Sequence, residues 1–358
     1  MAFDITNTYQ LLRSVQSLAP LHTFLQDRYF PTLNERDIFN STKVIVEYKD
    51  HGKKASPYIV PRYDGVPFER EGYEMKEFEP AHIGVKRALT IDDLEKRGFG
   101  EALFSNMCPD QRPGLMILQD LDDMRAANAR RREAMAAEVI FTNGVVMNQY
   151  ADDLGSHQDR EIHFYSESTN PATYTPSANW TTTEDSGKQI FNDLHAMVSM
   201  LSQRGLPASE VLVPAEVANI MLNNEAIQKY LDNRRYELGS VAPAELPAGV
   251  TRVMTLNVFG RMLDILCYED TYTDTDGKLK PFIPAGYIAV LAPNVGHTVY
   301  GAITQLEQSD GQFHTYQGTD IPKYLSDPAG NTRTIELKSA PLCIPFNKAP
   351  FISAKVLA

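Results

Sequence analysis

The segment between residues 41 and 90 places the tightest constraint on the fold, because it contains strand-like stretches but too few apolar side chains for a core of its own. Val44, Val46 and Tyr48 occupy alternate positions, which predicts a strand with one apolar face. Prolines, which cannot donate a hydrogen bond to a sheet, recur at Pro57, Pro61, Pro67 and Pro80. Such an arm is typical of a segment that packs on another chain, and a mobile surface loop is the alternative.

The composition indicates a soluble globular chain of two or three compact units. Of the 358 residues, 43% are hydrophobic and 22% are charged, which excludes a disordered chain. The net charge of -12 argues against a mainly electrostatic nucleic-acid binder, although a local basic patch is compatible with it. We expect no secretion signal and no membrane span. Three widely spaced cysteines, Cys108, Cys267 and Cys343, indicate free thiols in a reducing compartment.

A long helix is predicted from about Pro113 to Asn143, with Gly144 after its end. At 1.5 Å per residue it would be about 45 Å long. Both ends are apolar, whereas the middle, Arg125 to Glu133, reads RAANARRRE and offers only alanines for burial. We therefore expect the helix to pack at its ends, with a centre that is exposed or contacts another chain.

The arginines of that centre are candidate contacts between subunits. They are Arg125, Arg130, Arg131 and Arg132. A solvated face with local ion pairs is the plainer interpretation, and contact with packaged nucleic acid is a further alternative that the acidic composition disfavours.

Other elements follow from periodicity. Residues 4–18 predict a short helix that ends before Pro20. Its apolar face consists of Leu11, Leu12, Val15 and Leu18. From Ser186 helices and strands alternate, with a buried strand at 210–213 and a pair of strands at 253–268. The final stretch RTIELKSAPLCIPF predicts one further strand.

No constellation for catalysis or cofactor binding is recognisable. The eight histidines do not fall at metal-ligand spacings, and neither a phosphate-binding loop nor a nucleophile elbow is present. The stretch TDTDGKL fails as a calcium loop, so a tight turn at Asp276 and Gly277 is the better prediction. We expect no catalytic residue, no metal and no cofactor.

Several segments, spread in order over most of the chain, resemble the major capsid proteins of tailed phages of the phage lambda E type. Near the start and in the arm they are FLQDRYFPT and KEFEPAHIGVK. The long predicted helix contributes QDLDDMRAANARRREAMAAEVIFTNGV. Later segments are NEAIQKYLDNRRYELGS, KLKPFIPAGYIAVLAPNVGHTVYGAI and RTIELKSAPLCIP.

The resemblance implies the Hong Kong ninety-seven (Johnson) fold, an α+β capsid fold with an N-terminal arm, an extended β loop, a peripheral domain and an α/β axial domain. Carried onto this chain, it assigns 1–40 to the arm, 41–90 to the extended loop, 91–185 to the peripheral domain with a spine helix at about 113–143, 186–325 to the axial domain, and 326–358 to a return strand in the peripheral domain. Tyr58, Tyr63, Phe68 and Phe78 would then be subunit contacts of the extended loop.

The function implied is structural. Copies of the chain would assemble in the host cytoplasm into hexamers and pentamers of an icosahedral phage head around double-stranded DNA, with weak, non-specific DNA contact. Scaffold, portal and decoration proteins are further candidate partners. Some relatives form a covalent Lys–Asn cross-link, but no activating carboxylate is evident beside Lys53 or Lys54, and we predict none. An encapsulin-type shell protein is the alternative, and a soluble α/β enzyme built on 186–320 is disfavoured.

Overall fold

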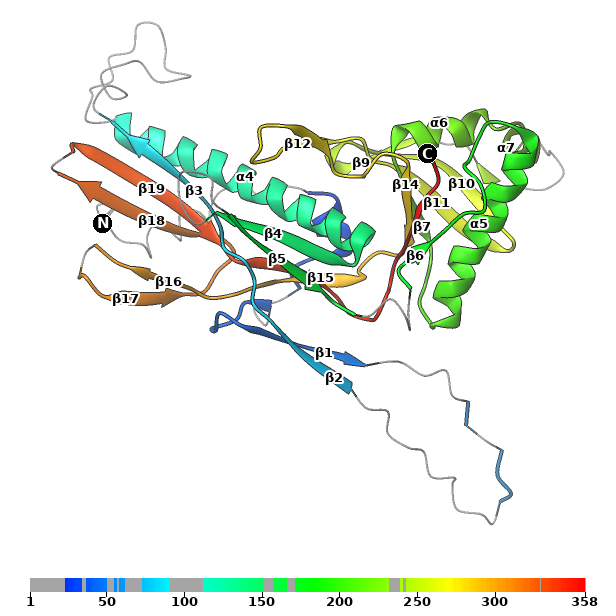
Figure 1. The fold of residues 1–358 in the computed structure, drawn as a ribbon, viewed down its shortest axis with the longest axis horizontal. Helices are drawn as coiled ribbons and strands as arrows, with labels where there is room; N and C mark the ends of the chain where they lie inside the picture. The colour runs from blue at the N-terminus through cyan, green and yellow to red at the C-terminus, as the bar shows by residue number, and fades with distance from the viewer. Residues whose placement is uncertain are drawn as a thin grey trace, which may run out of the picture.

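The fold is organised around one long helix and two sheets that lie towards opposite ends of the molecule (Figure 1). The structure is a computed structural model. It describes residues 23–33, 37–49, 55–56, 58–61, 73–90, 112–150, 157–165, 171–231, 239–240, 243–308, 310–328 and 330–357. The helix predicted at 4–18, and also Lys53, Lys54, Tyr63, Phe68 and Cys108, lie outside these residues.

Helix α4 (Arg112–Thr142) has 31 residues and begins and ends within one residue of the prediction. Its end is fixed by local chemistry. Asn143 adopts a left-handed backbone with φ of 54° and donates its N–H to the carbonyl of Val139 at 3.0 Å. Gly144 follows, where a Cβ would lie 2.6 Å from the carbonyl oxygen of Ile162, so only glycine permits the next strand to start there.

The first half of α4 packs on a three-stranded antiparallel sheet. Its strands, in the order β18, β19, β3, are Ile321–Asp327, Thr332–Ser339 and Ile83–Leu89. The buried contact consists of Ile117, Leu121 and Met124 on the helix and Tyr324, Ile335 and Leu337 on the sheet. The apolar residues of the helix recur every three or four positions and those of β19 every second position, so each set lies on one face and the two faces pack together.

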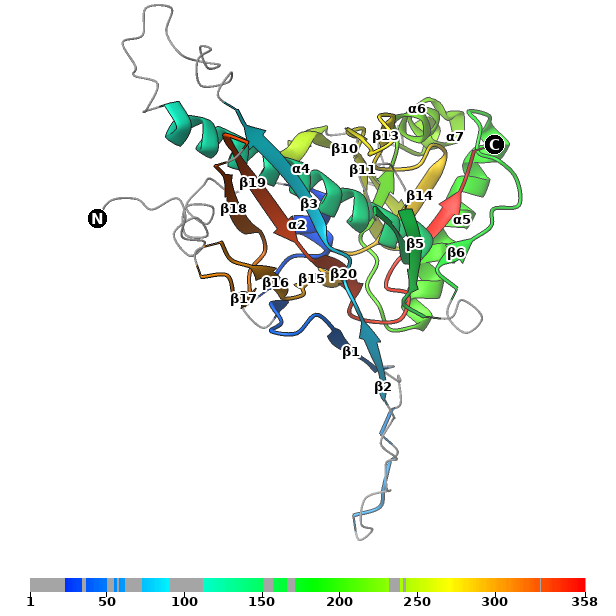
Figure 2. The same ribbon diagram turned by 60° about the vertical axis from the view of Figure 1, so that its left-hand side comes forward.

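The second half of α4 belongs to a larger core at the centre of the molecule. The elements around it are α2 (Leu25–Tyr29), β4 (Gly144–Tyr150), β5 (His157–His163), β15 (Gly296–Tyr300) and β20 (Pro341–Pro345). Strands β4 and β5 form a hairpin, β15 pairs with β20, and β16 (Ile303–Leu306) forms a separate hairpin with β17 (Phe313–Tyr316). Figure 2 shows α2 beneath α4.

An eight-stranded mixed sheet forms the other end of the molecule. Along the sheet the order is β6 (Thr173–Tyr174), β21 (Ile352–Lys355), β14 (Tyr287–Leu291), β7 (Glu210–Val213), β11 (Arg261–Cys267), β10 (Val250–Val258) and β8 (Gly239–Ser240), with β9 (Ala244–Leu246) also paired to β10. Helices α5 (Glu184–Gln203), α6 (Ala215–Asn223) and α7 (Glu225–Leu231) cover it and share its core. A small hairpin, β12 (Thr271–Thr273) and β13 (Leu279–Pro281), turns at Gly277 with φ of 75°, as the sequence predicts.

The chain crosses between the two ends more often than the sequence indicates. Strand β15 precedes residue 325 and β18 spans it, yet both share a core with α4, whereas β21, close to the C-terminus, pairs in the eight-stranded sheet. The predicted boundary at residue 325 therefore separates strands that pack together. The stretch RTIELKSAPLCIPF also forms two strands, because β19 ends at Ser339 and β20 begins at Pro341 in another sheet.

A two-stranded antiparallel hairpin projects from the body (Figure 1). It consists of β1 (Val44–Lys49) and β2 (Tyr73–Phe78), in a register that pairs Val44 with Phe78. Of the segment 41–90 predicted as an arm, Ile83–Leu89 form β3 of the three-stranded sheet, so only the β1–β2 hairpin and its loop project.

Candidate assembly surface

The base of the projecting hairpin is part of the central core. Val44, Val46 and Tyr48 are buried on its inner face, with 0%, 7% and 1% of their surface exposed. Phe78 is also buried, and its ring lies 5.5 Å from that of Phe164 in an edge-on contact. Phe78, predicted as a contact between subunits, is therefore enclosed by its own chain.

Charged groups hold the hairpin base in place. Lys76 donates to the backbone carbonyl of Phe164 at 2.6 Å, and ion pairs of 3.0 Å join Lys348 to Glu74 and Lys43 to Glu77. The last pair joins the two sides of the hairpin itself, is more than half exposed on both sides and contributes little on its own. The apolar contacts, Lys76 and Lys348 therefore hold the hairpin base against the body.

The outward face of the hairpin and its loop expose apolar side chains. On the face opposite the core, Ile45 and Met75 are 54% and 57% exposed. Farther along the loop, Tyr58 is fully exposed, and Ile59 and Val60 are 49% and 67% exposed. Burying such side chains against a partner would remove them from water at a gain of roughly 25 cal/mol per Å². Tyr58 is exposed in the single chain, and its contact with another subunit stays a prediction.

The middle of α4 differs from the prediction. The stretch around Arg125 to Glu133 was expected to offer only alanines for burial, but Asn128 and Glu133 are 3% and 2% exposed. Each is satisfied within the same chain. The sequence contains a signal for this at Glu133, because Ala129, Ala136 and Ile140 share its helical face and are all buried.

Glu133 anchors α2 to α4. Its carboxylate accepts the backbone N–H groups of Phe24, Leu25 and Gln26 at 3.0, 2.6 and 2.9 Å, and the hydroxyl of Tyr268 at 3.1 Å. Burial raises the pKa of Glu133, and the four donated hydrogen bonds oppose that rise. The first N–H groups of a helix have no partners within it, so the carboxylate replaces the missing acceptors.

Two arginines of the helix centre are paired within the chain. Arg132 donates to Asp320 at 3.1 Å, and Asn128 donates to the same carboxylate at 2.9 Å. Burial opposes the charge on Arg132, yet the nearby Asp320 leaves its pKa above the ordinary value. Arg131 donates to Asp274 at 2.6 Å.

Asp274 joins the β12–β13 hairpin to α4. Burial disfavours its charge, but hydrogen bonds from Lys280, Arg131 and the N–H of Thr275 outweigh that cost and lower the pKa of its carboxyl well below the usual range. Among the four arginines predicted as contacts between subunits, Arg130 is exposed and Arg125 is half-buried. Arg131 and Arg132 instead form ion pairs with Asp274 and Asp320 of the same chain.

A second carboxylate ties α2 to the eight-stranded sheet. Glu210, on β7, accepts Nε of Arg28 at 2.8 Å and the hydroxyl of Tyr29 at 2.7 Å, and it also forms an ion pair with Nη2 of Arg28. This short helix is therefore held from one side by Glu133 and from the other by Glu210. Local sequence patterns do not predict the contacts of α2 with Glu133 and Glu210, because each joins residues more than a hundred positions apart.

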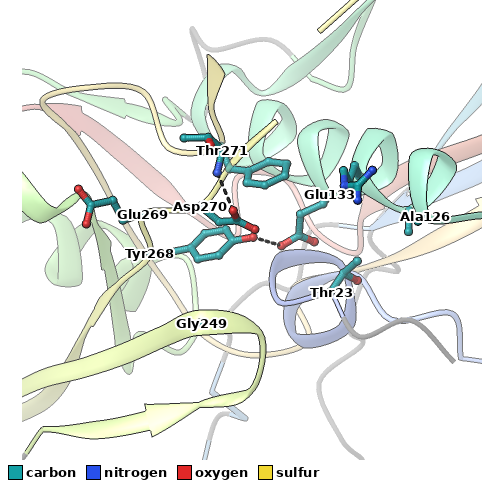
Figure 3. Close-up of a pocket in the computed structure, with 11 residues that line it drawn as sticks. Thr23, Ala126, Glu133, Gly249, Tyr268, Glu269, Asp270 and Thr271 are labelled. Atoms are coloured by element: carbon teal, nitrogen blue, oxygen red, sulfur yellow. Dashed lines mark hydrogen bonds between the residues drawn. The ribbon is translucent and has the colours of Figure 1, made fainter. Parts of the chain in front are cut away.

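A cleft of about 890 Å³ opens beside the centre of α4. One wall is formed by Ala126, Ala129 and Arg130 of the helix, and the opposite wall by residues 268–271 and Phe282. Figure 3 shows the Tyr268 hydroxyl directed at Glu133 deep in the cleft, with Thr23 on the α2 side. The acids Glu269 and Asp270 are exposed on the second wall.

Comparison with solved structures defines the class of the fold. A crystal structure described as a prophage capsid protein of Escherichia coli CFT073 is similar with a TM-score of 0.64 and 18% identity, over 98% of this chain and 99% of that one. The mature capsid of bacteriophage PhiM1 is similar with a TM-score of 0.46 and 11% identity, over 95% and 88%. An SrpI encapsulin of Synechococcus elongatus PCC 7942 gives 0.43 and 10%, over 97% and 95%. The first similarity defines a capsid fold of the Hong Kong ninety-seven type, whereas TM-scores below 0.5 support no conclusion.

The sequence itself matches the family of phage major capsid protein E over residues 7–356. The chain therefore belongs to the phage major capsid protein E family, and it is a structural protein of the phage virion. This match over nearly the whole chain favours the phage capsid over the encapsulin alternative.

Two further observations concern other classes of function. None of the helices in the described ranges is long and apolar enough to cross a membrane. Among the described side chains, no group of three or more His, Cys, Asp or Glu residues is arranged to hold a metal ion.

Proposed function

We propose that copies of this chain assemble head to tail into hexamers and pentamers, which close into an icosahedral shell around double-stranded DNA. The observation that supports this most directly is the projecting β1–β2 hairpin, whose loop exposes Tyr58, Ile59 and Val60 to solvent in the single chain. An apolar surface of this kind on a projecting segment is typical of an interaction site. In the shell, each hairpin lies on the neighbouring subunit.

We assign the two main cores to two structural units with different roles in the shell. A peripheral unit contains α4 and the three-stranded sheet, and an axial unit contains the eight-stranded sheet with α5, α6 and α7. Residues 1–40 serve as an arm, and the β1–β2 hairpin with its loop serves as the extended loop, because Ile83–Leu89 of the segment 41–90 pair in the three-stranded sheet. The axial unit gathers around the symmetry axis of each ring, and the peripheral units join neighbouring rings.

DNA contact in this proposal is weak and directed at phosphates. The net charge of -12 disfavours tight electrostatic binding of DNA, which suits a container that must release its contents. Catalysis has no part in the proposal. Scaffold, portal and decoration proteins remain proposed partners without an assigned surface.

Negative-stain electron microscopy and sedimentation of the purified full chain test the proposal. We expect rings, tubes or closed particles whose abundance rises with protein concentration. A folded monomer that sediments unchanged over the whole concentration range would contradict it.

A further inference from the structure

We propose that His297 is an acid-sensitive latch that holds the link between α2 and β1, residues 37–43, against β15. While the imidazole is neutral, it lies between Asp37 and Phe346 and the link stays attached. When the imidazole is protonated, it leaves this position and the link detaches. The inference concerns the single chain and does not depend on shell assembly.

A small number of backbone contacts attach the link to β15. Ile38 forms an isolated parallel bridge with Tyr300, and the N–H of Phe39 donates to the carbonyl of Tyr300 at 2.9 Å. Just beyond β15, the N–H of Ala302 donates to the carbonyl of Ser41 at 3.1 Å. Because these contacts immediately precede β1, their loss would free the first strand of the projecting hairpin at its root.

His297 lies on β15, where it contacts the link and the segment that follows β20. Its side chain is 19% exposed, and its Nε2 lies 3.9 Å from Oδ1 of Asp37, which is 13% exposed. The other carboxylate oxygen of Asp37 accepts the N–H of Leu33 at 2.8 Å. The ring of Phe346 stacks on the imidazole with 4.8 Å between the ring centroids.

The second ring nitrogen makes protonation of His297 unfavourable. Its Nδ1 is buried and has no hydrogen-bond partner among the residues that the structure describes. A neutral imidazole carries a single N–H, which we place on Nε2 because that nitrogen faces the carboxylate of Asp37. Protonation would add a donor at Nδ1, where it would be buried without an acceptor.

Neither neighbour of the imidazole fully compensates for this cost. The carboxylate of Asp37 attracts the positive charge, but a separation of 3.9 Å is too long for a hydrogen bond. The ring of Phe346 provides no acceptor, and a phenyl face attracts a cation only weakly at a partly exposed site.

Other charged groups on the surrounding elements are engaged elsewhere. Strand β20, which pairs with β15, contains no charged residue, and burial raises the pKa of its Cys343 thiol to about 12, so the thiol stays neutral. After β20, Lys348 forms an ion pair of 3.0 Å with Glu74 of β2. On α2, Arg28 is paired with Glu210. Among the described residues, Asp37 is thus the charged group that faces the imidazole.

The direction of the pH effect follows from these contacts. Burial lowers the pKa of His297, and Asp37 opposes this shift only in part. The detached, solvated imidazole has a pKa of about 6.5, so it binds a proton more readily than the attached one. The stabilisation of the attached link is therefore fully present above about pH 6.5 and is lost as the pH falls below that value.

Amide hydrogen exchange in the full, unassembled chain tests the inference. Mass spectrometry follows peptides that cover residues 37–43 and 296–303, with rates corrected for the intrinsic pH dependence of exchange. We expect protection of these peptides to fall by about tenfold or more between pH 7 and pH 5. His297→Gln has no titrating ring and should show equal protection at both pH values. Constant protection in the wild type would overturn the proposal.

His82→Gln is the matched control. His82 lies between β2 and β3, next to the other strand of the hairpin, and desolvation and the nearby Lys338 lower its pKa. The control variant should retain the full acid response of the link. Loss of that response in His82→Gln, or its persistence in His297→Gln, would show that another group is responsible.

Asp37→Asn tests the latch with the imidazole in place. The amide can still accept the N–H of Leu33, but it removes the charge that favours protonation of His297 in the attached state. The fall in protection between pH 7 and pH 5 should therefore be larger than in the wild type. An equal or smaller fall would overturn the proposal.

Discussion

The carboxylate of Glu133 accepts the backbone N–H of Leu25 at 2.6 Å, although the two residues lie 108 positions apart in the sequence. This contact joins the centre of the longest helix to the first turn of a five-residue helix that could not be stable alone. The polar centre of α4 is therefore a site of internal attachment.

Glu133→Gln should destabilise the subunit by about 2–3 kcal/mol, because an amide group replaces a charged acceptor of three backbone donors. Chemical denaturation of the unassembled subunit measures the change. Glu138→Gln, on the same helix, is the matched control. Its carboxylate accepts a single backbone N–H, that of Val146 at 2.9 Å, so its loss should be clearly smaller. Equal losses would show that Glu133 is not a special anchor.

Arg131→Glu should lower the free energy of unfolding of the subunit by about 1 kcal/mol, because it places a negative charge beside Asp274. Arg130→Glu changes the neighbouring, exposed arginine and should leave subunit stability within about 0.5 kcal/mol. Thermal and chemical denaturation of both variants provide the comparison. If Arg131→Glu abolished assembly while leaving the subunit equally stable, a role between subunits would be favoured instead.

Asp274 should make the stability of the protein depend on pH in the acid range. Its folded-state pKa is lowered, so its contribution is fully present above the pKa of the unfolded carboxyl, about 4, and is lost as the pH falls towards the folded-state value. The difference in unfolding free energy between wild type and Asp274→Asn should therefore be constant from pH 7 to about 5 and shrink as the pH falls below about 4. A difference that stays constant as the pH falls below about 4 would contradict the assignment.

Replacing Tyr58, Ile59 and Val60 together by serine should abolish shell formation without lowering the melting temperature of the subunit. These side chains are solvent-exposed in the single chain and can contribute only to contacts with a partner. Tyr48→Ala, at the buried base of the same hairpin, should instead lower the melting temperature. Electron microscopy measures shell formation and calorimetry measures the melting temperature. Normal shells from the triple variant would refute the role of the loop.

Periodicity predicts most of the local structure correctly. The ends of α4 follow from Pro113 and from the Asn143–Gly144 stop, and the tight turn at Gly277 follows from its sequence. Such features depend on a few neighbouring residues, so the sequence alone is sufficient for them.

Contacts between distant parts of the chain are a different matter. Arg132 and Asp320 are 188 positions apart, and neither has a neighbour that indicates the pairing. From its sequence, the run RAANARRRE therefore resembles a solvated surface. In the structure its side chains instead bind three other segments, namely α2, the β12–β13 hairpin and Asp320. The crossing of β21 back into the eight-stranded sheet is invisible for the same reason, since strand order in a sheet is not encoded locally.

The two-sided attachment of α2 has a mechanical consequence. Backbone hydrogen bonds pin the link between α2 and β1 to the end of β15, and β2 continues directly into β3. A pull on the hairpin tip would travel along one strand to α2 and along the other to the three-stranded sheet. At α2 the tension divides between Glu133 and Glu210, so strain in the lattice would be spread over both ends of the subunit instead of peeling the hairpin from its base.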